Sequence, residues 1–187
     1  MRTPERLSEL PGRGRVRWRD SAPMFAILAC LSGAAWPPLV LTLPIWPPAN
    51  WRLGPEMDWR LIVLAVGLAA TPIGLYLVAR ERDRRGRPTG RLGIVWRFLL
   101  YGGAGAAALQ IGATVIVTVM GWFEAGGVAQ AAGASETTIL IYGVGGLPIA
   151  ILVGVSYALW AGLCCAFIAF EPQPEVRDRL GLMGEQA

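Results

Sequence analysis

Residues 80–91 read Arg-Glu-Arg-Asp-Arg-Arg-Gly-Arg-Pro-Thr-Gly-Arg, and they separate two long apolar halves of the chain. Six of these twelve residues are arginines. An arginine at the centre of a bilayer costs roughly 2.5–3.5 kcal/mol on insertion scales, so this stretch cannot enter the hydrocarbon. The sequence therefore predicts a water-exposed loop on one face of a membrane, with one helical hairpin before it and one after it.

The composition is that of a membrane protein with little catalytic chemistry. Hydrophobic residues make up 54% of the 187 residues, and the mean hydropathy is +0.47. The net charge is +4, and every basic residue is an arginine. Histidine is absent, which removes the commonest general base and the commonest metal ligand. We therefore expect no catalytic residue, no metal site and no bound cofactor, and we predict that the protein is not an enzyme.

Four apolar runs are long enough to cross a bilayer, because about 20 helical residues span about 30 Å of hydrocarbon. We place these membrane spans at about 22–45, 59–79, 94–123 and 137–170. A basic tail of residues 1–21 precedes them, and a tail of residues 171–187 follows. The predicted fold class is all-α: a polytopic integral membrane protein with four transmembrane helices arranged as two hairpins.

Prolines and glycines predict where the spans bend. Pro37–Pro38 should kink or end the first span, and Pro72 should bend the second, with the hydroxyl of Thr71 bonding to a freed carbonyl. The fourth run is too long for one upright span, so we expect either a steep tilt or a short helix before Pro148 followed by the main span. Residues 124–136, which are mostly small, are expected to form a loop.

The distribution of arginines predicts the orientation. The tail, the central loop and the C-terminus hold nearly all of them, whereas the other two loops hold only Arg52 and Arg60. By the positive-inside rule, both termini and the central loop are cytoplasmic, in a bacterial-type inner membrane. The arginine-rich start and Ser32–Ala35 also resemble a secretory signal peptide, but the apolar stretch continues past this point and favours a transmembrane helix.

Small residues recur at every fourth position in two of the predicted helices. Such rows let two helices approach closely in a membrane. We expect most of these contacts to lie within the chain; the alternative is that one row faces a partner subunit, and so many rows in a small protein favour an assembly. The rows are Gly154, Ala158, Gly162 and Ala166 in the fourth span, and Ala26, Cys30 and Ala34 in the first.

Gln110, Thr114 and Thr118 fall on one face of the third span. They admit two interpretations: a polar strip that lines a pore or substrate path, or a hydrogen-bonding device that holds a neighbouring helix. The interior of the spans contains no Asp, Glu, His or Arg, which argues against a proton-coupled carrier. The packing interpretation is therefore preferred.

Lipid headgroups are the expected partners of the arginine-rich stretch, because basic segments beside a span bind anionic lipid on the cytoplasmic side. Arg85–Pro88 resembles the core of an AT-hook, but the positive-inside rule accounts for it better, and no nucleic-acid partner is expected. The residues predicted to contact headgroups are Arg82, Arg84, Arg85, Arg87, Arg91 and Trp18.

Three cysteines, Cys30, Cys164 and Cys165, are predicted to lie in the cytoplasmic half of the membrane. With Met24 they would offer soft ligands to copper or zinc. Their spacing matches no metal-binding pattern, and buried cysteine behaves as a small hydrophobe. A structural role is therefore preferred.

Three classes of function remain open at this point. The first is a non-catalytic membrane subunit or scaffold that packs against other membrane proteins or against itself. The second is a transport component or a small oligomeric channel built on the strip at Gln110. The third is a membrane enzyme that acts on lipid-like substrates at the cytoplasmic face, and only the arginines support it. We prefer the first, because the packing rows are plentiful and the chemistry is absent.

Overall fold

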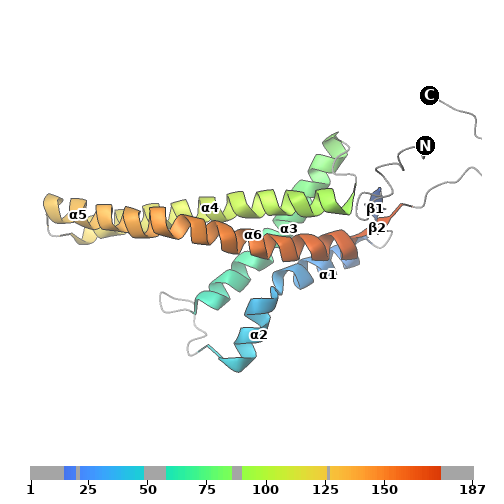
Figure 1. The fold of residues 1–187 in the computed structure, drawn as a ribbon, viewed down its shortest axis with the longest axis horizontal. Coiled ribbons are helices and arrows are strands. Elements are labelled where there is room, and N and C mark those ends of the chain that lie inside the picture. The colour runs from blue at the N-terminus through green and yellow to red at the C-terminus, as the bar shows by residue number, and fades with distance from the viewer. Residues whose placement is uncertain (1–14, 20–21, 49–57, 86–89, 126, 174–187) are drawn as a thin grey trace, which may run out of the picture.

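The structure is a computed structural model, and it describes residues 15–19, 22–48, 58–85, 90–125 and 127–173. In these ranges the protein is predominantly helical, as the sequence predicts (Figure 1). Two π-helical stretches, η2 (Ile139–Gly145) and η3 (Cys165–Ala169), continue the last helix on either side of α6 (Gly146–Cys164). The elements in chain order are β1 (Val16–Trp18), α1 (Ala22–Ala34), α2 (Pro37–Ile45), α3 (Trp59–Arg85), α4 (Arg91–Glu124), α5 (Val128–Thr138), η2 (Ile139–Gly145), α6 (Gly146–Cys164), η3 (Cys165–Ala169) and β2 (Phe170–Pro172).

Three helices are long and apolar enough to cross a membrane: α3, α4 and the continuous helix Val128–Ala169. The helices α1 and α2 form a fourth candidate as a pair, bent by 61°. The bend falls directly before Pro37, which begins α2. Proline fits the first turn of a helix, where its missing N–H needs no partner, but it cannot continue a helix from before. The kink predicted at Pro37–Pro38 is therefore confirmed.

The loop predicted at residues 124–136 is wrong. The helix α4 ends at Glu124, and α5 begins at Val128. Alanine has the highest helix propensity of all residues, and it outweighs the small-residue composition that suggested a loop. The alanines in this helix are Ala129, Ala131, Ala132 and Ala134.

The last helix is not interrupted before Pro148, so of the two predicted forms the broken one is wrong. Residues Val128–Ala169 form one helix of 42 residues, about 63 Å long at 1.5 Å per residue. The widened turn of η2 stands where the break was expected, and there the N–H of Gly146 reaches the carbonyl of Ile141. Pro148 supplies no N–H to the carbonyl four residues before it, and the wider turn accommodates this loss.

The helix α3 continues past its predicted end at residue 79 and stops at Arg85. Half of the arginine-rich stretch is therefore helical rather than a loop, and its positive charges suit the C-terminal end of the helix dipole. Pro72 lies inside α3, and the Thr71 hydroxyl donates to the carbonyl of Gly67 at 2.8 Å. Pro72 has no N–H to donate to the carbonyl of Leu68, four residues before it. The Thr71 hydroxyl was expected to bond to this freed carbonyl, but it bonds to the carbonyl of the preceding residue, Gly67.

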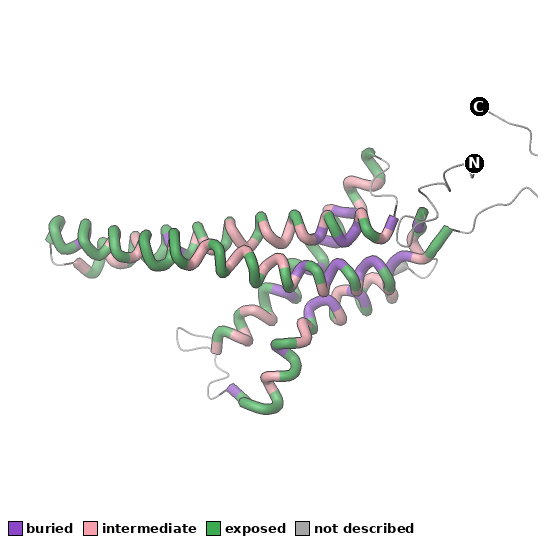
Figure 2. The backbone as a smooth tube through the Cα atoms, in the orientation of Figure 1, coloured by how far each residue is buried: buried purple, intermediate pink, exposed green. Residues whose placement is uncertain are grey.

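Buried residues gather at one end of the molecule. The helices α4 and α6 lie side by side along the long axis, α3 crosses them, and α1 lies beside the end of the last helix (Figure 1). Purple, buried segments concentrate near the strands, whereas α5 and the neighbouring parts of α4 and α6 are mostly green or pink (Figure 2). The fully buried side chains at the strand end include Val78, Ile94, Cys165 and Phe170.

A two-stranded antiparallel ladder, which the sequence did not predict, closes this end. Trp18 pairs with Phe170 and Arg17 with Glu171, and Arg17 also forms an ion pair with Glu171 at 2.8 Å. A separate bridge joins Arg15 to Gly90. The ladder and the bridge bring the N-terminal segment, the start of α4 and the end of the last helix together.

Candidate functional site

The small-residue row of the fourth span lies against α4. A methyl group added at Gly154 would collide with Ala106, and one added at Gly102 would collide with Ala158. Such close backbone approach maximises dispersion contacts between two helices that hydrophobicity does not draw together in lipid. This part of the row therefore packs inside the α4–α6 hairpin.

The same contact continues toward the strand end. A methyl group at Gly162 would lie 2.9 Å from Cβ of Phe98 and 3.2 Å from Cα of Val95. Ala166 is fully buried in the core. All four residues of the predicted row therefore pack against other parts of the same chain.

The row of the first span also packs internally. Cys30 and Ala26 pack against the buried core cluster that contains Cys165. The carbonyl of Ala34 accepts a hydrogen bond from the Tyr157 hydroxyl. The helix α1 is thereby held to the last helix along most of its length.

Three helices meet at Gly33. A methyl group there would lie 2.9 Å from the Thr71 side chain in α3 and 3.2 Å from Cα of Ala161 in α6. Beside it, the indole N–H of Trp160 donates to the carbonyl of Ser32 at 2.9 Å. A glycine at this position lets α1 approach both neighbours at once.

The strip on the third span is hydrogen-bonded within the protein. The Gln110 amide donates to the carbonyl of Tyr142 in η2 at 2.7 Å. Thr114 donates to the carbonyl of Gln110 at 2.8 Å, and Thr118 to that of Thr114 at 2.7 Å. A cavity of about 250 Å³ beside Gln110 and Thr114 is otherwise lined by apolar residues and Gly143. Gln110 thus links α4 to the π-helical turn, whereas Thr114 and Thr118 bond within α4 itself.

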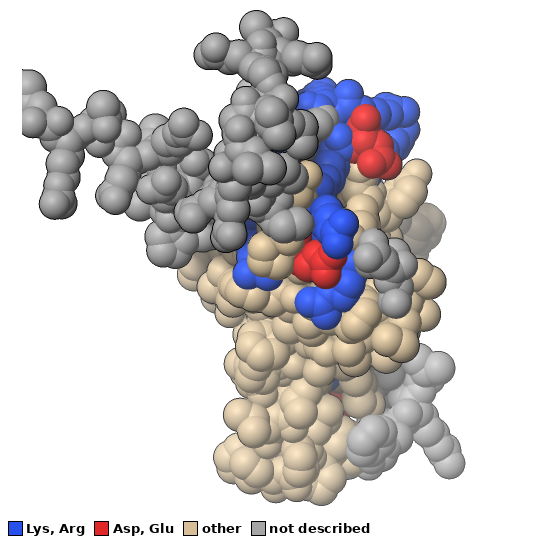
Figure 3. Space-filling model, turned by 90° about the vertical axis from the view of Figure 1, so that its right-hand side faces the viewer, with Lys and Arg blue, Asp and Glu red and all other residues tan. Residues whose placement is uncertain are grey.

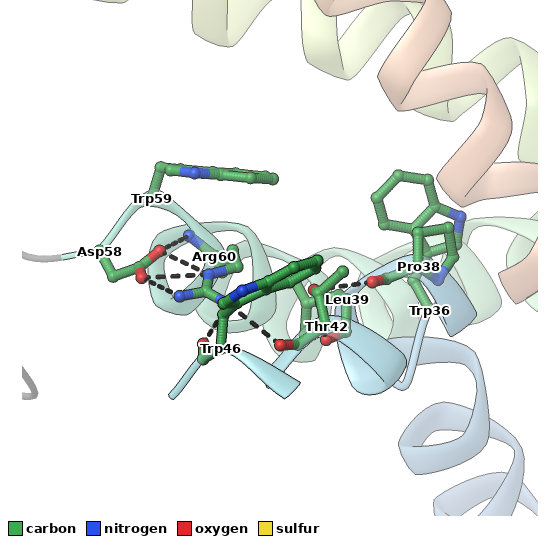
Figure 4. Close-up of a pocket in the computed structure, with 8 residues that line it drawn as sticks. All are labelled: Trp36, Pro38, Leu39, Thr42, Trp46, Asp58, Trp59 and Arg60. Atoms are coloured by element: carbon green, nitrogen blue, oxygen red, sulfur yellow. Dashed lines mark hydrogen bonds and ion pairs between the residues drawn. The ribbon is translucent and has the colours of Figure 1, made fainter. Parts of the chain in front are cut away.

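A pocket of about 400 Å³ lies where α2 meets the start of α3 (Figure 4). Its walls combine three indole rings with one ion pair. The residues that line it are Trp36, Pro38, Leu39, Thr42, Trp46, Asp58, Trp59 and Arg60.

Arg60, at the start of α3, forms hydrogen bonds to the end of α2 beside this pocket. Its guanidinium bonds to both carboxylate oxygens of Asp58, with Nε 3.0 Å from each. The same group donates to the carbonyls of Trp46 at 2.6 Å and Thr42 at 3.3 Å, at the C-terminal end of α2, where cations are favoured. The pKa of Asp58 is lowered by the hydrogen bond from the Arg60 side chain and, next, by that from the Arg60 backbone N–H.

Arginines crowd the end of the molecule that holds β1 and β2 (Figure 3). The residues predicted to contact headgroups divide into two kinds there. Arg84 and Arg85 are exposed, and Arg87 lies outside the described residues. Trp18 instead stacks on Phe170, with 4.5 Å between ring centroids.

Arg82 and Arg91 are packed against aromatic rings. The guanidinium carbon of Arg82 lies 5.5 Å from the Phe170 ring centroid, and that of Arg91 lies 4.5 Å from the Phe167 ring centroid. Sequence reasoning treated all these arginines as equivalent surface charges. The phenylalanines that end the last apolar run were the only signal that some of them have a partner.

Glu81 joins α3 to α4 at the same end. Its carboxylate forms an ion pair with Arg97 at 2.7 Å and accepts a hydrogen bond from the Tyr101 hydroxyl at 2.9 Å. This polar contact was not foreseen, because the spacing between the residues says nothing about how two helices are rotated.

The cysteines do not converge on a metal site. No group of three Cys, Asp or Glu side chains suited to a metal occurs in the ranges that the structure describes. Cys165 is fully buried, and Met24 is largely exposed. Cys30 in α1 packs against the buried cluster that contains Cys165 of η3.

Comparisons with known protein families, with curated proteins and with solved structures find no match to this chain.

Proposed function

We propose that this chain is a non-catalytic subunit of a bacterial inner-membrane complex, in which it packs against partner membrane proteins. The observation that carries this proposal is the uncovered length of the α4–α6 hairpin. The helices α1 and α3 meet the hairpin near the strand end, and the rest of its length has few buried residues (Figures 1 and 2). In a complete helical bundle, other helices would cover α4 and α6 along their whole length. Here a helix of a partner protein has room to pack against the exposed part of the hairpin.

The open face of α4 has the shape that a partner helix requires. Gly105 and Gly112 stand two turns apart on one face, and a methyl group at either would meet no described residue within 4 Å. Leu109 and Ile116 lie one turn further along the same face, and each is 60% exposed. Small residues that alternate with large ones offer both a groove and side chains to fill the partner's groove.

The four-span topology with cytoplasmic termini belongs to the same proposal. The antiparallel pairing of β1 with β2 supports an even number of crossings, because both segments lie at one end of the molecule. The bridge between Arg15 and Gly90 supports two crossings in each half of the chain. The positive-inside rule assigns this arginine-rich end to the cytoplasm.

A pore along the third span is less well supported. The Gln110 amide and the hydroxyls of Thr114 and Thr118 all donate to carbonyls of the chain itself. Donors that are already satisfied offer little to a passing substrate.

The test is to isolate the protein from its native membrane in a gentle detergent, by a C-terminal tag, and to measure the mass and composition of the particle. We expect a membrane protein to co-purify in fixed stoichiometry. The variant Gly112→Leu should lose this protein while keeping the thermal stability of the isolated chain, because Gly112 faces no described neighbour.

Gly112→Ala is the matched control, since a single methyl group leaves the groove mostly open, and it should retain the partner. A monomer from native membranes, or a partner equally retained by Gly112→Leu, would contradict the proposal. A homo-oligomer that is sensitive to Gly112→Leu would identify the partner as a second copy of this chain.

A further inference from the structure

We propose that Arg82 and Arg91 together form a binding site for a phosphate group at the cytoplasmic membrane boundary. The inference rests on the proposed orientation, which places this end at the headgroup level. It goes further than a diffuse basic surface, because it selects two of the arginines and assigns them a ligand.

Two contacts hold the guanidinium of Arg82 in place, and one of its N–H donors has no described acceptor. One terminal nitrogen, Nη2, donates to the carbonyl of Val16, and the guanidinium stands over the ring of Phe170. The other, Nη1, is buried and has no hydrogen-bond partner among the described residues. A buried donor of a charged group without an acceptor is costly, so its position favours a ligand that supplies one.

Arg91 repeats this arrangement at the start of α4. Its guanidinium lies over the ring of Phe167, and its Nε is buried without a partner in the described part of the chain. The two rings that support these arginines stand three residues apart, with Phe167 in η3 and Phe170 at the start of β2. Both guanidinium groups are thus held against one short segment.

The strand β1 brings the two arginines to the same place. The carbonyl of Val16 accepts from Arg82, while the preceding residue, Arg15, bridges Gly90, the neighbour of Arg91. Two consecutive residues, Arg15 and Val16, therefore contact the residue before α4 and the end of α3. Arg82 and Arg91 each have one buried N–H donor without a described acceptor, and a phosphate has several acceptor oxygens to offer them.

Two of the nearby carboxylates already pair with other arginines. Glu81 pairs with Arg97 at 2.7 Å, and Glu171 pairs with Arg17 at 2.8 Å. Neither Arg82 nor Arg91 forms an ion pair with any carboxylate that the structure describes. An anion from outside the chain would neutralise them, and the phosphate of a lipid headgroup and a free phosphate share the chemistry that fits.

The experiment uses the full chain, purified in a neutral detergent and stripped of lipid. Phosphatidylglycerol and inorganic phosphate are titrated separately, and binding is followed by native mass spectrometry and by the shift in Tm. We expect Arg82→Gln and Arg91→Gln each to weaken binding at least about tenfold, roughly the contribution of a hydrogen bond to a charged group.

Arg84→Gln is the matched control, because it removes the same charge from the same helix end but from an exposed side chain. It should change the affinity less than about threefold at moderate salt, where exposed charges are screened. Equal losses in all three variants, or no saturable binding by the wild type, would overturn the inference. If Arg82→Gln lowers Tm without ligand, Arg91→Gln decides alone.

The two titrations separate the possible sources of the phosphate. Saturation by the lipid with no competition from millimolar inorganic phosphate identifies a headgroup site, whereas displacement by inorganic phosphate identifies a site for soluble phosphate. Because the protein is purified without partners, this result is independent of the proposed subunit role. If the isolation from native membranes yields no co-purifying protein while the purified chain binds phosphate, only the subunit role is contradicted.

Discussion

Gly102 and Gly154 face each other across the α4–α6 contact, each turned toward the other's carbonyl. A methyl group at Gly102 would lie 3.1 Å from the Gly154 oxygen, and one at Gly154 would lie 3.0 Å from the Gly102 oxygen. Because the two backbones approach this closely, there is room between them for the Cα hydrogens of glycine but not for a larger side chain. The hairpin is therefore held by shape, at a place where a side chain on either helix would separate the two.

Gly154→Leu is expected to destabilise the protein by about 1–3 kcal/mol or more, because overpacking at a rigid backbone contact forces the helices apart. The measurement is the Tm in detergent, with hairpin packing followed by resistance to proteolysis. Gly105→Leu is the control: it adds the same side chain to the same hairpin, at a glycine with no described neighbour within 4 Å. Similar Tm values for the two variants would contradict the close contact.

Gln110→Leu is expected to cost about 0.6–2 kcal/mol, the range for an interhelical hydrogen bond in a membrane. The variant loses the bond to the Tyr142 carbonyl and leaves that carbonyl of η2 without its amide donor. The measurement is the Tm, with hydrogen exchange at η2 as a local probe.

Thr118→Val is the comparison for Gln110, since its hydroxyl bonds only within its own helix. Its effect should be smaller. If Gln110→Leu left the Tm unchanged but altered the flux of a solute through proteoliposomes, the strip would be a transport path rather than a packing device.

Asp58→Asn is expected to lower Tm at pH 7, because it removes the charge that holds Arg60. The folded-state pKa of Asp58 is lowered, so the ion pair stabilises the protein fully above the unfolded pKa of about 3.9. This contribution is lost as the pH falls through the lower folded pKa. The difference in Tm between wild type and variant should therefore be constant near neutrality and shrink in acid.

The same pH series on Glu124→Gln provides a control from an exposed carboxylate. It should show little difference from wild type at any pH. A gap between wild type and Asp58→Asn that persists unchanged in strong acid would show that the carboxylate does not act through its charge.

Cys30 and Cys165 are expected to form a disulfide when membranes are treated with a mild oxidant such as diamide. Their side chains are neighbours where α1 packs against η3, so little movement is needed to join them. The linked peptides are detected by mass spectrometry after digestion. Cys164→Ser should leave the cross-link intact, and Cys165→Ser should abolish it; a cross-link that depends on Cys164 would contradict the rotation of the last helix.

The positions of the apolar helices could be predicted from the sequence because bilayer thickness and the cost of buried charge act on composition alone. The kink at Pro37 was predictable for a similar reason, since proline acts on its own helix. In contrast, α5 was missed because alanine-rich helix and small-residue loop share one composition. The length of α3 was misjudged because charge ends a span without ending a helix.

The contacts between elements were beyond sequence reasoning. The ion pair of Asp58 with Arg60 lies within two residues and was open to inference, but its bonds to the carbonyls of α2 depend on a loop closing back. The support of Arg82 by Phe170 depends on how three chain segments meet. Such contacts join positions far apart in the chain, and no local pattern marks them.

The pairing of β1 with β2 also sets the order in which the fold is completed. The segment that contains Val16 is synthesised first, but its partner emerges only after all four apolar runs have been made. The helix α1 likewise inserts long before Cys165 exists to receive it. Native packing at the strand end is therefore a post-translational event, and a chain truncated at Ala169 would keep its inserted helices yet present an unpaired N-terminal strand. A protease that reaches this end of the molecule would meet an unpaired strand in an unfinished copy and a paired strand in a finished one.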